Sequence, residues 1–196
     1  MAIHFGNDKI KDIYVGSDKI KEVYYGSEKV WGEVESTQEG YWVHKDTGIK
    51  TYFGADADFI TNGIMSSPPW KSDCSEVNIP EGVTSLGDYC FTGCFSLTSI
   101  TLPESVTSLG ESCFEMCISL TSITIPEGVT SIGLACFYEC ASLILATVLP
   151  AIPPSLGAGA FDGVHPSFNI QVRSPYVDTY KTATNWTYYD YLISAI

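Results

Sequence analysis

A block of about 23 residues repeats three times in the middle of the chain, and it constrains the fold more than any other feature. The copies read VNIPEGVTSLGDYCFTGCFSL from Val77, ITLPESVTSLGESCFEMCISL from Ile100 and ITIPEGVTSIGLACFYECASL from Ile123. Self-similarity at a fixed period of this length is typical of a solenoid, in which each unit buries its apolar edge by stacking on its neighbours. We therefore predict a stack of similar units.

Within each copy the apolar residues follow the pattern LxxLxL, which is typical of the strand in a leucine-rich solenoid. The pattern starts at Cys74, Leu97 and Leu120. After Leu143 the register slips by one residue, and the next strand ends at Pro150. A degenerate fourth unit then places four residues at the repeated core positions: Leu156, Ala160, Phe161 and Val164. The predicted fold class is a leucine-rich-repeat solenoid of short β-strands joined by turns or short helices.

The sequence divides into three segments by composition. Residues 1–32 repeat with a period of ten, and their turn sequences alternate with runs of Lys, Ile, Val and Tyr. This pattern predicts a small antiparallel β module. Residues 33–40 are polar and are expected to form a linker. The solenoid domain is expected over residues 41–196, with an N-terminal cap at 41–78, repeats at 79–163 and a C-terminal cap at 164–196.

The two caps are needed because an open end would expose core residues and strand edges. Alternating residues from Tyr41 predict one or two strands before the first repeat. For the C-terminal cap we expect a strand near 168–172 and a short helix near 175–182. An aromatic end follows, and several of its residues must belong to the core of the cap: Trp186, Tyr188, Tyr189 and Tyr191.

The charge of the chain restricts its partners. The formal net charge is −13, and no Lys or Arg lies between Lys71 and Arg173. Nucleic acid is excluded as a direct partner of the repeats, because binding to phosphates needs clustered cations. No apolar stretch is long enough to span a bilayer, so we expect no membrane insertion. The beginning of the sequence lacks the features of a secretion signal, which favours another route of export or none, unless a signal was removed.

Six of the seven cysteines recur with the repeat, as pairs at 90/94, 113/117 and 136/140, and the seventh is Cys74. Their spacing is compatible with zinc, and disulfides are a second alternative. The period favours a third interpretation, in which stacked units form two columns of buried thiols that pack as small apolar groups. Cys74 occupies a leucine position and is expected in the core as well.

No catalytic, cofactor-binding or metal-binding residue is identified, and we predict that the protein is not an enzyme. The three histidines, His4, His44 and His165, lie in different segments and beside no repeated Cys or Ser. The sequence contains no nucleophile elbow, zinc-protease motif or phosphate loop. The loop with Asp56 and Asp58 lacks the further oxygen ligands of a calcium site. The periodic serines at 85, 108 and 131 are expected to be turn or capping residues.

The residues between the LxxLxL positions are expected to line the exposed face of the sheet. The candidate contact residues there are hydroxyl-bearing: Thr98, Ser99, Thr101, Thr121, Ser122 and Thr124, beside Ser75, Glu76 and Asn78 of the first unit. Such a face could hydrogen-bond sugars, but a simply solvated sheet is favoured. Tyr89 and Tyr138 in the turns are further contact candidates. Glu81, Glu104 and Glu127 are expected to form a solvated ridge.

The repeated unit resembles the BspA-type leucine-rich repeat of bacterial surface proteins and some protist proteins. The resemblance covers about residues 41–196, and it implies a right-handed solenoid with a non-enzymatic role in adhesion or recognition. It implies neither a particular ligand nor fixed binding residues. Residues 1–32 separately resemble short repeats near the N-termini of structural proteins from bacteriophages of gut bacteria.

The leading hypothesis is therefore a virion appendage on the particle exterior, of the head-fibre or tail-fibre type. Residues 1–32 would dock on other virion or surface proteins or form a homo-oligomer, with four candidate anchoring residues: Tyr14, Tyr24, Tyr25 and Trp31. The solenoid would present a surface to a host glycan or surface protein. The alternatives are a BspA-like adhesin of the bacterial cell surface and a carbohydrate-binding accessory domain.

Overall fold

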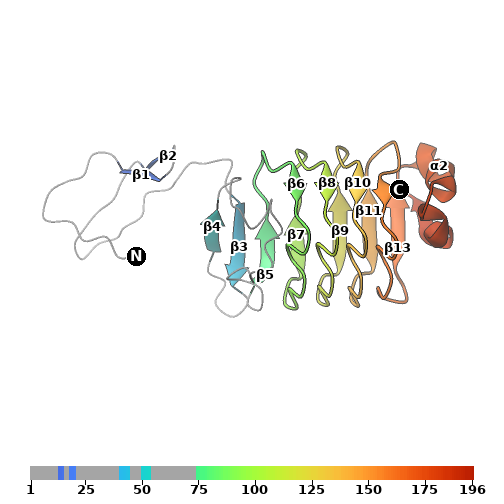
Figure 1. Ribbon diagram of the computed structural model, residues 1–196, viewed down its shortest axis with the longest axis horizontal. Coiled ribbons are helices and arrows are strands. Elements are labelled where there is room, and N and C mark those ends of the chain that lie inside the picture. The colour runs from blue at the N-terminus through green and yellow to red at the C-terminus, as the bar shows by residue number, and fades with distance from the viewer. Residues whose placement is uncertain (1–12, 16–17, 21–39, 45–49, 54–73) are drawn as a thin grey trace, which may run out of the picture. The chain divides into compact units, whose positions relative to one another are not determined.

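The computed structural model describes residues 13–15, 18–20, 40–44, 50–53 and 74–196 (Figure 1). The chain divides into two compact units, Met1–Thr37 and Gln38–Ile196. In the first unit, β1 (Ile13–Val15) and β2 (Asp18–Ile20) pair in antiparallel fashion. This hairpin is of the kind predicted from the decapeptide repeat. Tyr14 lies in β1, whereas the other anchoring candidates, Tyr24, Tyr25 and Trp31, and the expected third strand lie outside the described residues.

The second compact unit begins with a sheet in which two antiparallel strand pairs are followed by a parallel pair. Its strands are β3 (Gly40–His44), β4 (Lys50–Phe53) and β5 (Cys74–Asn78). β3 pairs antiparallel with both β4 and β5, and β5 then pairs parallel with β7 (Ser99–Thr101) of the next repeat. The strands predicted for the N-terminal cap are therefore present. Asp56 and Asp58 lie outside the described residues.

The repeats stack side by side through parallel strands (Figure 1). After β7 come β9 (Ser122–Ile125), β11 (Leu145–Val148) and β13 (Asn169–Val172). β9, β11 and β13 pair in register, so that Ser122 lies beside Leu145 and Leu145 beside Asn169. In the repeats, Pro80, Pro103, Pro126 and Pro150 follow the long strands. Proline has no N–H to donate to a ladder, which fixes the end of each strand.

A second sheet runs along the stack and was not predicted. It consists of four two-residue strands in parallel order: β6 (Ser85–Leu86), β8 (Ser108–Leu109), β10 (Ser131–Ile132) and β12 (Ser155–Leu156). The periodic serines therefore pair as strand residues, and their assignment to turns or caps was wrong. The second residue of each short strand is a buried Leu or Ile.

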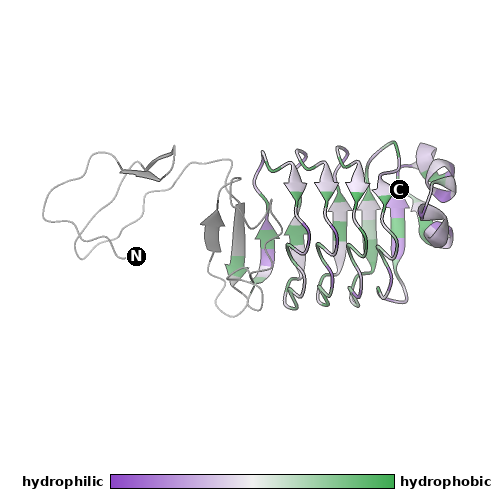
Figure 2. Cartoon of the chain, viewed as in Figure 1, coloured by the Kyte–Doolittle hydropathy of each residue, from purple (hydrophilic) through white to green (hydrophobic). Residues whose placement is uncertain are grey.

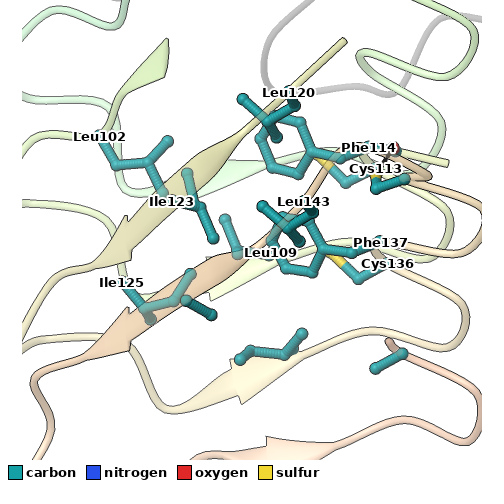
Figure 3. Packing of buried hydrophobic residues seen from close by; sticks show 14 of the residues in the cluster. Leu102, Leu109, Cys113, Phe114, Leu120, Ile123, Ile125, Cys136, Phe137 and Leu143 are labelled. Carbon is teal, nitrogen blue, oxygen red and sulfur yellow. Dashed lines mark hydrogen bonds between the residues drawn. The ribbon is translucent and has the colours of Figure 1, made fainter. Parts of the chain in front are cut away.

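Stacked phenylalanines fill the centre of the solenoid. Neighbouring rings of Phe91, Phe114, Phe137 and Phe161 lie 5.2–5.3 Å apart and are parallel within 4°. The repeated cysteines lie in the same buried cluster, and Figure 3 shows Cys113 and Cys136 beside Phe114 and Phe137. In the degenerate fourth unit Ala160 takes the place of the first cysteine, and half-buried Val164 that of the second. The predicted core positions of that unit are confirmed for Leu156, Ala160 and Phe161, whereas Val164 packs against the core without being fully buried.

The C-terminal cap closes the stack with short helices and one more strand. It contains η1 (Ser174–Tyr176), α2 (Val177–Thr182), η2 (Trp186–Leu192) and β14 (Ile193–Ala195). Tyr180 and Trp186 are buried and donate side-chain hydrogen bonds of 2.8 Å to the carbonyl oxygens of Pro150 and Pro154. The predicted strand and helix are present, whereas β14, which pairs parallel with β13, was not predicted. None of the helices in the described part of the chain has the length and apolarity to cross a lipid bilayer.

Candidate binding surfaces

The outer face of the long strands carries the hydroxyl residues singled out from the sequence. All six are exposed, on or just before β7 and β9: Thr98, Ser99, Thr101, Thr121, Ser122 and Thr124. The equivalent residues of the first repeat are instead half-buried: Ser75, Glu76 and Asn78. They are less exposed because β5 lies between β3 and β7. Figure 2 shows apolar (green) and near-neutral (pale) positions along β7, β9 and β11.

One of these hydroxyls, that of Thr98, stabilises the stack. Thr98 Oγ1 donates to the carbonyl oxygen of Ser75 over 2.8 Å. Two threonines directly before the short strands act in the same way: Thr107 Oγ1 donates to Thr84 O over 2.9 Å, and Thr130 Oγ1 donates to Thr107 O over 3.1 Å. A hydroxyl at these positions satisfies a backbone carbonyl of the preceding unit, so its recurrence has a structural cause. The fourth unit changes the outer face, because Ile144 and Leu145 replace hydroxyl residues there.

The turn side of the solenoid brings Tyr89 and Tyr138 onto one acidic surface. Tyr89 OH donates to Glu111 Oε1 over 2.8 Å, and this bond raises the pKa of Tyr89. The charge of Glu139 raises the pKa of Tyr138. The charge of Glu115 also raises the pKa of both tyrosines, so both lie within electrostatic reach of the same carboxylate. Although they occupy different positions in their repeats, they therefore share a surface.

A ridge of exposed apolar residues follows the same turns, and the sequence reasoning missed it. We call Phe95, Met116 and Ile118 the turn ridge; their side chains are 47%, 36% and 43% exposed. Phe95 and Ile118 are equivalent positions of consecutive units, and Ser119 Oγ donates to the carbonyl oxygen of Phe95. The third unit has Ala141 at this position. The signal that could have revealed the ridge is an apolar residue directly after the second cysteine of each pair.

A pocket of about 280 Å³ opens in the C-terminal cap, and we call it the cap pocket. Its polar lining groups are Asp162, His165, Tyr189 and Tyr191, and its apolar lining includes Phe161 and Phe168. Tyr189 OH donates to Asp162 Oδ1 over 2.9 Å and accepts a hydrogen bond of 3.3 Å from the N–H of Phe161. Burial raises the pKa of Tyr189 to about 12, so its phenol keeps its proton at neutral pH.

The thiols lie where they have little chemical reactivity. All seven cysteines are buried, which confirms the interpretation of the repeated pairs as core thiols. Cys117 and Cys140 donate S–H hydrogen bonds to Phe91 O and Phe114 O of earlier units, over 3.2 and 3.1 Å. Burial raises the pKa of Cys74 to about 11 and that of Cys140 to about 12. In the part of the chain that the structure describes, no group of three or more His, Cys, Asp or Glu residues could hold a metal ion.

The glutamate ridge is more than a solvated edge. Glu81, Glu104 and Glu127 are all exposed, as expected. Glu127 also forms a bidentate ion pair with Arg173, with N–O distances of 3.0 and 3.1 Å. This pair lowers the pKa of Glu127 and connects the third repeat to the start of the C-terminal cap. The expectation that all three glutamates are simply solvated was wrong for Glu127, because Arg173 is distant in sequence but close in the stack.

Comparison with protein families matches residues 70–178, more than half of the chain, to the BspA type leucine-rich repeat region. A comparison with curated proteins finds no match. Among solved structures, a leucine-rich repeat protein of T. pallidum is 32% identical over 53% of this chain and 47% of its own length, with a TM-score of 0.46.

Two further solved structures are similar to part of the chain. A leucine-rich repeat protein of Bacteroides ovatus is 28% identical over 62% of this chain and 30% of its own, with a TM-score of 0.49. A leucine-rich cell surface protein of Faecalibacterium prausnitzii is 27% identical over 52% of this chain and 32% of its own, with a TM-score of 0.40. The chain thus covers less than half the length of each of the three solved proteins.

Proposed function

The chain belongs to the BspA-type leucine-rich repeat family, and from this premise we propose that it is a non-enzymatic adhesion protein of a bacterial cell surface. In this role the solenoid is a rigid scaffold that presents its turn side to a partner on another surface. Solenoids commonly act in this way, because stacking creates long continuous faces for binding.

The observation that carries the proposal is that the turn ridge is exposed, whereas the repeated apolar positions of the solenoid are buried. Phe95, Met116 and Ile118 are exposed, although the stack offers each unit a buried position for apolar residues. Exposed apolar groups that lie together are typical of protein–protein contact sites. The thiols and phenylalanines that recur with the repeat are buried, so the groups left for function are those of a binding surface.

The surroundings of the tyrosines and of the thiols support a role in contact with a partner rather than in catalysis. Tyr89 and Tyr138 lie beside carboxylates, and the carbonyl oxygen of Tyr138 accepts a hydrogen bond of 2.8 Å from the N–H of Met116 in the turn ridge. Tyrosine is enriched where proteins bind each other. The burial that raises the pKa of Cys74 and Cys140 leaves these thiols protonated at neutral pH. A protonated, buried thiol is a poor nucleophile, which argues against cysteine catalysis in the described part of the chain.

The virion hypothesis has less support than the cell-surface alternative. It depends on the resemblance of residues 1–32 to phage proteins, and the family match begins only at residue 70. The cell-surface role instead depends on the repeats themselves. Digestion of intact source cells with a protease, followed by mass spectrometry of the released peptides, tests this location. Peptides of the chain should appear in the released fraction, and their detection only after lysis would contradict a surface location.

Adhesion can be tested with fluorescent beads that carry the full chain. We expect them to attach to at least one of three surfaces: immobilised mucin, immobilised matrix glycoproteins or a layer of bacterial cells. The double variant Phe95→Ala with Ile118→Ala should attach about tenfold less, because it removes the exposed apolar groups. The fold should tolerate this change, since the third unit already has Ala141 at the same position.

The matched control is Ile152→Ala, which removes an aliphatic side chain that is 81% exposed but outside the turn ridge. Its beads should attach like those of the unchanged chain. The proposal fails if the coated beads attach no better than uncoated ones to any of the surfaces. It also fails if the turn-ridge variant attaches as well as the control.

A further inference from the structure

The cap pocket combines features that neither the core nor the outer faces of the solenoid share. It is lined by residues from two separate parts of the chain, 161–168 and 189–192, which the C-terminal cap brings together. Its volume of about 280 Å³ is just below the range of about 300–1,000 Å³ typical of sites for drug-sized ligands. The pocket therefore suits a ligand with a single ring.

A buried phenol holds the acceptor of this pocket in place. Tyr189 is only 7% exposed, and its hydroxyl is fixed between the N–H of Phe161 and Asp162 Oδ1. Asp162 itself is exposed. Its second oxygen, Oδ2, has no hydrogen-bond partner among the described residues. The carboxylate is thus oriented by one oxygen and can accept hydrogen bonds from a ligand with the other.

His165 supplies a donor to the same pocket. Its Nδ1 accepts a hydrogen bond of 3.0 Å from the N–H of Ser167. A neutral imidazole with an acceptor at Nδ1 carries its hydrogen on Nε2. Nε2–H has no partner among the described residues, so it is available as a donor. The pocket offers an oriented acceptor and an oriented donor within one small lining.

An exposed aromatic ring completes the lining. Tyr191 lines the pocket and is 78% exposed, although the same cap buries Trp186 and Tyr189. Exposure of a large amphipathic ring has a cost in the free chain, because it leaves apolar area in contact with water. A ligand with a flat apolar face would cover that area while its edges remain polar.

We propose that the cap pocket binds one pyranose ring of a carbohydrate, with Tyr191 against the apolar face of the sugar and Asp162 and His165 on its hydroxyls. This inference rests on the proposed function and names the chemical class of a partner. A sugar hydroxyl both donates and accepts, and therefore satisfies a carboxylate and an imidazole N–H together. A cation would face the N–H of His165, and an anion would face the carboxylate of Asp162, so a neutral polyol fits best.

Saturation-transfer NMR on the full chain tests the proposal directly. The probes are the methyl pyranosides of glucose, galactose, mannose and N-acetylglucosamine, each at millimolar concentration. At least one should receive saturation from the protein, with its ring protons the most strongly affected. Tyr191→Ala and Asp162→Asn should each weaken its apparent affinity about tenfold or more, since each removes one side of the site.

The matched control is Tyr188→Ala, which removes a neighbouring tyrosine that is 72% exposed and does not line the cap pocket. It should bind the same pyranoside with unchanged affinity. The inference is overturned if no pyranoside receives saturation, or if Tyr191→Ala and Asp162→Asn bind as well as this control. It is also overturned if a cationic probe, Nα-acetyl-lysine methyl ester, competes for the site more strongly than any pyranoside.

The two proposals fail in different ways. If coated beads adhere but no pyranoside binds, the carbohydrate inference is wrong and adhesion through the turn ridge stands. If a pyranoside binds but coated beads adhere to none of the surfaces, the adhesion proposal is wrong and the cap pocket remains a sugar site.

Discussion

At the scale of single residues, the repeated cysteines pack in the core of the solenoid as small apolar groups, although their thiols are potentially reactive. Each pair lies within the buried cluster that contains the stacked phenylalanines. In the fourth unit Ala160 in this cluster and Val164 packed against it replace a pair. Alanine and valine can stand there because the position requires a small apolar group rather than a thiol. The sulfur atoms add weak S–H donors that reach carbonyl oxygens of earlier units, as Cys117 and Cys140 do.

These buried thiols predict a loss of stability at alkaline pH. The ordinary thiol pKa is 9.0, and burial raises the pKa of Cys74 to about 11 and that of Cys140 to about 12. Above pH 9 the unfolded chain releases these protons while the folded chain keeps them, so the free energy of unfolding falls as pH rises. Each fully buried thiol contributes a slope of about 1.4 kcal/mol per pH unit in that range.

Urea denaturation at pH 7.0, 9.0, 9.5 and 10.0 measures this effect. We expect nearly constant stability up to about pH 8.5, followed by a steep decline. The variant with alanine at positions 90, 113 and 136 is the control, since Ala160 already occupies that column in the fourth unit. Its decline should be shallower. A free energy of unfolding that is the same at pH 7.0 and pH 10.0 would show that the thiols ionise freely in the folded chain.

At the scale of the elements, the second sheet depends on glycines that let neighbouring units approach closely. Gly133 follows β10, and a Cβ atom there would overlap the carbonyl carbon and oxygen of Gly110 in the preceding unit. These contacts are with backbone, which cannot move aside without separating two units. Gly133→Ala should therefore destabilise the protein by about 2–3 kcal/mol.

Gly128→Ala is the matched control for this change. It lies in the same repeat, and its Cβ would meet the carbonyl oxygen of Glu104 at 3.2 Å, which a small shift relieves. We expect an effect within about 0.5 kcal/mol. Thermal and urea unfolding followed by circular dichroism compare the two variants. Equal stabilities would show that the units can separate around Gly133 at no cost.

The elements also show which features a sequence can reveal. The long strands were predictable because LxxLxL places Val77, Ile100 and Ile123 on one buried face at a fixed period. The short strands were not, since two residues such as Ser85–Leu86 contain too little pattern to distinguish a strand from a turn. Tyr89, Ser112 and Ala135 adopt a positive φ with no glycine to announce it. Such positions are imposed by the stack rather than by local preference.

The candidate sites were harder to predict than the fold. The exposure of Thr98 and Thr121 followed from the strand period, whereas the turn ridge lies in turns, where the repeat period alone does not tell an exposed apolar residue from a buried one. The cap pocket combines Asp162 and His165 with residues 189–192, which no short motif connects. Sequence alone also could not decide which tail aromatics are buried, because Trp186 and Tyr189 differ from Tyr188 only through the helical turn that places them.

At the scale of the whole molecule, the solenoid unit contains its own means of stability. Its described core consists of residues between Cys74 and Ile193, and the C-terminal cap covers the last repeat with Tyr180 and Trp186. In such stacks stability is roughly the sum of the units and of the contacts between neighbours. Met1–Thr37 forms a compact unit of its own. We expect this unit to have a separate task.

That task can be tested by deleting Met1–Thr37. The hairpin β1–β2 consists of two three-residue strands, and a hairpin of this size is marginal alone in water. We therefore expect the segment to associate with copies of itself or with another protein. Light scattering should give an oligomeric mass for the full chain and a monomeric mass for Gln38–Ile196, with unchanged unfolding of the solenoid as the control. Equal monomeric masses would exclude self-association and leave a second protein as the partner of the hairpin. An oligomeric mass for both would instead place the contact between copies on the solenoid, where the turn-ridge variant Phe95→Ala with Ile118→Ala should then remove it.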